Sequence, residues 1–203
     1  RFPPHPAGLD IAKMELASGI ERLVYASCVI GVATLAAWFV AKLTPLSPAD
    51  LVSPALAPAV LAVLRAGASF VGVYGFSVLF NSTPSMACAA ACIGAVANTA
   101  RLELIDLAGL PLEAAALLGA LTAGLVAAVV GPRMGLPRIS LTVPSIVIMV
   151  PGLYLYKAMY FMCDFDVVGA MGWGMRAAMV IVCLPIGLAL ARVLTDKGWR
   201  YDR

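Results

Sequence analysis

Long apolar runs alternate with short polar or Pro-rich segments along the whole chain. A helix needs about 20 apolar residues to cross the hydrocarbon core of a bilayer, and runs of that length predict six membrane spans. The predicted spans are Leu23–Ala41, a segment from Ala59 or Ala66 to Phe80, Ser85–Ala100, Leu112–Val130, Ile139–Met162 and Val168–Leu190. The pattern therefore predicts an all-α protein, a polytopic transmembrane helix bundle.

The segments between the runs predict the links. Thr44–Pro58 is Pro-rich and is interpreted as an extracytoplasmic loop. NSTP, residues 81–84, predicts a tight turn, and its Pro84 suits the first turn of the next helix. RLELIDLAG, residues 101–109, is expected to be a short polar link that begins where the third span ends.

Composition excludes an ordinary soluble domain. Of the 203 residues, 62% are hydrophobic and 12% are charged, whereas soluble domains are about 45–50% apolar and about 25% charged. The net charge of +3 includes no basic tract with interleaved aromatics, so no nucleic-acid partner is expected. The one histidine, His5, leaves the five cysteines without metal-ligand partners, and these are predicted to be reduced, small core residues. Neither a metal nor a cofactor is expected.

The distribution of positive charge predicts the orientation. Most of the 14 lysines and arginines fall on the side that holds both ends of this segment, the NSTP turn and residues 131–138. Because cytoplasmic loops are enriched in Lys and Arg, both termini of this segment are predicted to be cytoplasmic.

Small residues recur at four-residue spacing inside the spans. This spacing lets helix backbones approach closely in lipid, so the helices are expected to pack against one another. Drift towards alanine in a GC-rich genome is the alternative explanation. The residues in question are Ala87, Ala91 and Ala95, Gly119 and Ala123, and Gly124 and Ala128.

The fifth span carries Pro151 and Gly152 side by side near its middle, with Pro144 seven residues earlier. Both residue types disfavour a continuous helix, so a break is predicted there. The half-helix that begins at Gly152 would present a partial positive charge and free N–H groups, which suit a carboxylate. A proline kink that only shapes packing is the alternative.

A weak internal echo suggests two related units. PAGLD, residues 6–10, precedes SGIERLVYA and an apolar helix, much as PGLYLY precedes GMRAAMV and the last helix. The chain is accordingly divided into the end of a first repeat (1–45), a linker (46–65) and a second repeat of five helices (66–203). A repeat of five spans, an odd number, gives the two repeats opposite orientations in the membrane. Such inverted repeats with interrupted helices indicate a secondary transporter. Alternatively, any two membrane helices with charged starts look alike.

From about Ala66 to its end, the chain resembles the second membrane domain of the threonine/serine exporter family. The matching stretches are GFSVLFNSTP, a helix ending in NTAR, the Gly-rich fourth span and LPRISLTVPSIVIMVPGLYLYKAM. SGIERLVYA and its helix resemble the end of the first membrane domain. The chain also looks like the small subunit of the split version implicated in succinate export.

The resemblance implies a ten-span exporter of two five-span halves in the plasma (inner) membrane of a bacterium, driven by the proton motive force. The first four spans would then lie outside this segment, on the same chain or on a partner subunit. Related segments often carry an additional Pro–Gly-like break before VPG, but Pro144 has no glycine beside it. The expected partners are a small polar, carboxylate-bearing solute and the lipid bilayer. A homo-oligomer is left open.

Polar residues in or near the spans are the candidates for a substrate path, because charge within a membrane faces a cavity or a partner. Arg176 is expected to pair with Asp164 or Asp166, or to hold a substrate anion. Arg65 and Arg101 are alternatively explained by snorkelling to the headgroups, Tyr156 by an interfacial aromatic belt, and Asn81 by a turn. The path candidates are Pro151, Gly152, Tyr156, Lys157, Arg176, Asn81, Asn98 and Arg101.

Few acids are candidates for proton coupling. Glu113 lies closest to a span interior, where burial favours the protonated form, although it also suits a helix N-terminus. Asp10 and Glu15 follow the PAG of the first repeat and are further candidates.

Three classes of function were compared. The first is a secondary transporter that exports threonine or serine, with a dicarboxylate exporter subunit as its variant. The second is a membrane assembly or scaffold subunit without a transport path. The third, an intramembrane enzyme, lacks HExxH, GxSxG and an acid pair inside a span, so no enzymatic activity is expected.

Overall fold

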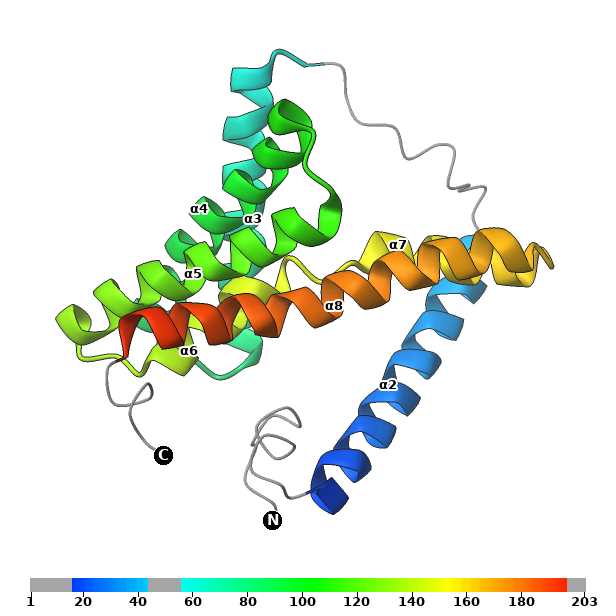
Figure 1. Ribbon diagram of the computed structural model, residues 1–203, viewed down its shortest axis with the longest axis horizontal. Helices are drawn as coiled ribbons and strands as arrows, with labels where there is room; N and C mark the ends of the chain where they lie inside the picture. The colour runs from blue at the N-terminus through cyan, green and yellow to red at the C-terminus, as the bar shows by residue number, and fades with distance from the viewer. Residues whose placement is uncertain (1–15, 44–55, 197–203) are drawn as a thin grey trace. The chain divides into compact units, whose positions relative to one another are not determined.

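Helices account for nearly all of residues 16–43 and 56–196, which are the residues that the computed structural model describes (Figure 1). Within those two ranges no strand occurs. The predicted helical membrane class is thereby confirmed. In chain order the helices are α2 (Leu16–Leu43), α3 (Pro58–Leu79), α4 (Pro84–Ala108), α5 (Leu112–Met134), α6 (Arg138–Val147), α7 (Gly152–Cys163) and α8 (Val167–Thr195).

Four of these helices, α3, α4, α5 and α8, are long and apolar enough to cross a membrane. The pair α6 and α7 passes the same test together and is bent by 41° at its break, which allows a fifth span. These elements match the second to sixth predicted spans. The predicted first span lies in α2, where a shorter apolar stretch, Gly31–Val40, is found, so that span stays a prediction.

Proline and glycine mark several helix ends. The helix α3 begins at Pro58, one residue before the earlier of the two predicted starts, Ala59, and α4 begins at Pro84 as predicted. Between them Asn81 adopts a φ of 58° in the turn, as expected for a turn-forming asparagine. The helix α4 ends only at Ala108 and is capped by Gly109, whose φ of 61° suits a glycine cap. The prediction that a polar link begins at residue 101 is therefore wrong, because residues 101–108 continue the helix.

The chain forms two compact units. One comprises Arg1–Val52 and Leu155–Met171, and its described part holds α2, most of α7 and the start of α8. The other comprises Ser53–Tyr154 and Gly172–Arg203, and it holds α3 to α6 and most of α8. The predicted inverted repeat stays a prediction, since PAGLD lies outside the described residues.

The helix α4 lies at the centre of the second unit, where it contacts α3, α5 and α6 (Figure 1). A Cβ added at Gly94 would lie 2.6 Å from Val73 Cγ2 on α3 and 3.2 Å from Ser145 Cα on α6. Only a residue without a side chain lets the three helices approach this closely. The buried face of α4 is otherwise largely alanine: Ala87, Ala89, Ala90, Ala91, Ala95 and Ala97. The prediction of helix packing through small residues is confirmed here.

Glycines also bring α5 and α8 together. A Cβ at Gly187 on α8 would lie 2.5 Å from Leu117 O, and a Cβ at Gly124 on α5 would lie 2.5 Å from Ala191 Cβ. Arg138, at the start of α6, donates to Gly124 O (2.8 Å) and to Thr195 Oγ1 (2.7 Å). These contacts fix one end of α8 against α5 and α6.

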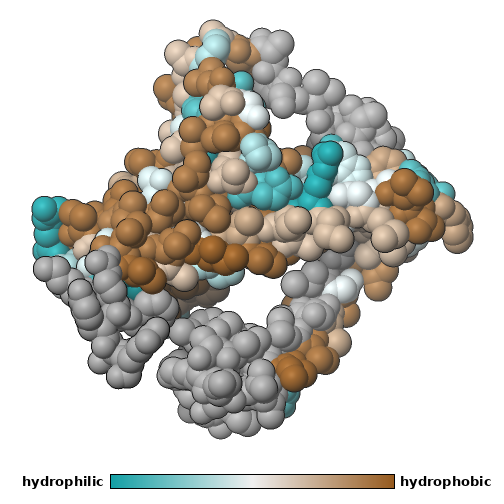
Figure 2. Space-filling model, viewed as in Figure 1, coloured by the Kyte–Doolittle hydropathy of each residue, from teal (hydrophilic) through white to brown (hydrophobic). Residues whose placement is uncertain are grey.

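The outer faces of the helices are apolar, as a lipid-facing surface requires. Figure 2 shows hydrophobic residues dominating the visible surface over α5 and α8, and exposed large side chains include Val129, Met179 and Ile186. Cys88 and Cys92 share one face of α4 as their spacing predicts, but both are exposed. Their interpretation as core residues is therefore wrong, because α4 turns its alanines rather than its cysteines inward.

Candidate functional site

The fifth span is broken where Pro151 and Gly152 predict a break. The helix α6 ends at Val147 and α7 begins at Gly152, and the N–H groups of Met149 and Val150 bond three residues back, to Ile146 O (2.9 Å) and Val147 O (3.1 Å). Pro144 causes no earlier break, since α6 continues through it.

The N-terminal end of α7 carries fewer free donors than expected. The Gly152 N–H donates to Val150 O (2.8 Å) and the Tyr154 N–H donates to Pro151 O (3.1 Å). The expectation of free N–H groups is therefore wrong for these two residues, because the tight turn at Pro151 satisfies them locally. The helix dipole still places partial positive charge at this end.

The other side of the break, the carboxyl end of α6, is held by Arg101 of α4. Arg101 Nη1 donates to Met149 O at 3.0 Å, and the Met149 side chain is fully buried. Gly119 on α5 packs against this contact. A Cβ added at Gly119 would lie 3.1 Å from Arg101 Cβ and 3.2 Å from Met149 Sδ. A cation at a helix carboxyl end is electrostatically favourable, so Arg101 stabilises the break.

An aromatic pair lies next to the break. The Tyr154 ring stacks on Trp173 of α8, with centroids 5.6 Å apart and an interplanar angle of 7°. The guanidinium carbon of Arg176 lies 5.2 Å from the Trp173 centroid, which is a cation–π contact.

The structure therefore brings two predicted residues close to the break: Arg101 on Met149 O, and Arg176 on the tryptophan that stacks on Tyr154, a tyrosine that was not predicted. Glu113 lies in the first turn of α5 and is half-buried, which fits both a dipole partner and a residue of the site. Tyr154 and Trp173 were missed because tyrosine and tryptophan are common near membrane surfaces. The available signal was the position of Tyr154, two residues after the break.

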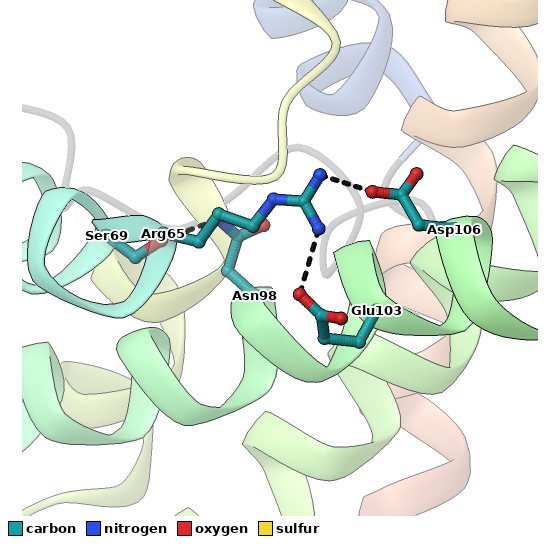
Figure 3. A network of polar contacts seen from close by, with 5 residues as sticks. All are labelled: Arg65, Ser69, Asn98, Glu103 and Asp106. Carbon is teal, nitrogen blue, oxygen red and sulfur yellow. Dashed lines mark hydrogen bonds and ion pairs between the residues drawn. The ribbon is translucent and has the colours of Figure 1, made fainter. Parts of the chain in front are cut away.

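Arg65 forms a separate ionic cluster between α3 and α4 (Figure 3). Its Nη1 donates to Glu103 Oε1 at 2.9 Å, and its Nη2 donates to Asp106 Oδ2. The Arg65 side chain is only 16% exposed, so the pairing with two carboxylates neutralises it within the bundle. This pairing also explains why α4 continues beyond residue 101.

Asn98 bonds across helices as predicted. Its Nδ2 donates to Ser69 Oγ on α3 at 2.8 Å (Figure 3). Asn81 lies in the exposed turn between α3 and α4, at the opposite end of α3 from Arg65. Asn98 lies well inside α4, 17 residues further along the chain. The two asparagines therefore belong to different parts of the second unit.

Tyr156 and Lys157 lie in the other unit, on α7. The Tyr156 and Tyr160 rings are 6.3 Å apart, which confirms that these two tyrosines share a face. Asp166 accepts the Gly169 N–H at 3.0 Å and so caps the start of α8. Asp10 and Glu15 lie outside the described residues.

Two of the hollows in the described part of the second unit have linings that do not include the break. One of about 290 Å³ includes Gly131, Arg138 and Asp196 in its lining, and an apolar groove of about 470 Å³ lies between α4 and α5. Among the described residues, no three His, Cys, Asp or Glu side chains come together as metal ligands.

These features define a multi-pass membrane protein with a broken span, an arrangement that transporters use at their substrate sites. The family model described as "Threonine/Serine exporter, ThrE" matches residues 65–194. The match covers more than half of the chain and includes Arg65, Arg101, the break and Arg176, so the chain belongs to the threonine/serine exporter family. No curated protein and no solved structure matches it.

Proposed function

We propose that this protein exports small polar amino acids, threonine or serine, by alternating access at the broken span. The observation that carries the proposal is the family match across residues 65–194, which contains the break. Discontinuous helices line the substrate sites of many secondary transporters, where half-helix ends face the charged groups of the solute. The break with Arg101, Tyr154 and Arg176 around it supplies such groups.

The energy source in this proposal is the proton motive force. Glu113 is the acid proposed to carry the proton, because this carboxylate is half-buried in the first turn of α5. The topology of the proposal is a bacterial inner-membrane protein with both ends of this segment in the cytoplasm, completed by a further repeat on the same chain or on a partner subunit.

Export of a dicarboxylate such as succinate is the second candidate. The observation that favours it is the presence of two arginines close to the break: Arg101 on Met149 O, and Arg176 on Trp173, which stacks on Tyr154. Two cations suit two carboxylates, whereas an amino acid offers one carboxylate and one ammonium. A scaffold subunit without a transport path would not need cations at a broken span.

Efflux from cells tests the proposal. Cells that overproduce the complete protein are loaded with labelled threonine, serine or succinate and compared with empty cells. We expect faster efflux of threonine or serine, and we expect a protonophore to abolish the difference. Efflux of succinate alone would favour the second candidate, and no difference for any of the three would reject the exporter.

A further inference from the structure

The arginines of α3 and α4 differ in the charge of their hydrogen-bond partners. Arg65 on α3 has two carboxylate partners, Glu103 and Asp106. Arg101 on α4 has a neutral one, the carbonyl oxygen of Met149, and no carboxylate of the described residues pairs with it. A charge inside a membrane protein is costly unless it faces a partner or a cavity. None of the described residues therefore supplies an anion that neutralises Arg101.

The donors of Arg101 show where such an anion fits. A guanidinium carries five N–H donors in a rigid plane, and Arg101 uses Nη1 for Met149 O. Its Nε is buried and has no hydrogen-bond partner among the described residues. The edge formed by Nε and Nη2 is one of the edges on which a guanidinium binds a carboxylate through two parallel hydrogen bonds.

We propose that Arg101 binds the carboxylate of the transported solute through its Nε edge, while Nη1 remains on Met149 O. This inference rests on the proposed export function and names the residue that recognises the substrate. It commits to a small solute with a free carboxylate, such as an α-amino acid. The solute then neutralises a partly buried cation that contacts the broken span, and the site opens to one side during the transport cycle.

The link between Arg101 and the break gives the bound solute a structural effect. The carboxylate would lie on the same guanidinium that holds the carboxyl end of α6. Gly119 on α5 leaves room for the Arg101 side chain here, since a Cβ at that position would lie 3.1 Å from Arg101 Cβ and 3.4 Å from its Cγ. Substrate binding and the position of the α6 end are thus coupled through one side chain.

Ligand-dependent unfolding of the purified complete protein in detergent tests the inference. Threonine should raise the unfolding temperature, since a ligand that binds only the folded state stabilises it. Threoninamide, which keeps the side chain and the amine but lacks the carboxylate, should not raise it. An equal shift with threoninamide would overturn the inference without any mutation.

Variants then locate the carboxylate partner. Arg101→Gln should abolish the threonine-dependent shift, and Arg101→Lys, which keeps the charge but loses the planar fork, should weaken threonine binding at least about tenfold. Arg133→Gln, at an exposed position of α5, is the matched control and should bind as the parent does. If Arg101→Gln does not fold, Arg101→Lys and threoninamide still decide the question.

The outcomes separate the two proposals. Threonine binding by the parent and by both Arg101 variants with equal affinity would overturn the role of Arg101 and leave the export function standing. No response of the parent protein to threonine, serine or succinate would overturn the export function and the inference with it.

Discussion

Asn98 on α4 and Ser69 on α3 form a hydrogen bond of 2.8 Å between two helices that each have span length. Both side chains are almost completely buried, at 5% and 3% exposure, and Asn98 Oδ1 has no partner among the described residues. A polar pair inside the bundle thus fixes the register of α3 on α4.

Replacing Ser69 by alanine should destabilise the protein, because Asn98 Nδ2 then loses its acceptor while Oδ1 already lacks a partner among the described residues. Interhelical hydrogen bonds in membrane proteins contribute about 0.6 kcal/mol on average and up to about 1.7 kcal/mol. A double-mutant cycle of Ser69→Ala and Asn98→Ala, measured by unfolding in detergent, should give a coupling free energy in that range. Strictly additive effects would show that the bond contributes nothing.

Arg65→Gln should lower stability by about 1–3 kcal/mol, between the values of exposed and buried ion pairs. The variant leaves Glu103, which is 23% exposed, without its cation. Arg65→Lys keeps a point charge and should lose less. The control is Arg133→Gln, whose exposed position predicts a change within about 0.5 kcal/mol. Equal effects at positions 65 and 133 would contradict the ion-pair cluster.

Two glycines of α8 should respond to alanine in opposite directions. At Gly187 a Cβ meets Leu117 O at 2.5 Å, whereas at Gly172 no other described atom outside the local helix lies within 4 Å. Gly187→Ala should cost about 1–3 kcal/mol through overpacking, and Gly172→Ala should stabilise α8 by up to about 1 kcal/mol. Thermal unfolding of the two variants side by side tests the close approach of α5 and α8, which equal shifts would refute.

Straightening the break should abolish transport without impairing insertion of the protein into the membrane. The double variant Pro151→Ala with Gly152→Ala restores helix-forming residues, so efflux should fall at least about tenfold while membrane insertion stays normal. Pro185→Ala is the matched control, because Pro185 lies inside α8 without breaking it. A scaffold role predicts the reverse pattern, in which the double variant assembles poorly and any efflux is unaffected.

The break and the spans could be predicted from the sequence because their causes are local. Pro151 lacks a backbone donor and Gly152 is flexible wherever they occur, and apolar runs of span length need no knowledge of neighbours. The predicted use of small residues in α4 and α5 succeeded for a similar reason. Close helix packing in lipid has few other solutions.

The end of α4 and the composition of the site could not be predicted, since both depend on contacts between distant segments. Glu103 and Asp106 indicate a polar link until Arg65, on another helix, neutralises them. Arg101 lies at the end of a predicted span, where the sequence suggests a snorkelling arginine. Only the packing of α4 against α6 places it on Met149 O. Tyr154 acquires its role from Trp173 and Arg176 of α8.

The most direct test of the proposed exporter is solute counterflow in proteoliposomes containing the purified complete protein. Vesicles preloaded with unlabelled threonine should transiently accumulate labelled threonine from the outside, and protein-free vesicles should not. Arg101→Gln should abolish the accumulation, while Arg133→Gln should retain it. Parent vesicles that accumulate none of labelled threonine, serine or succinate when preloaded with the same solute would contradict the proposed function.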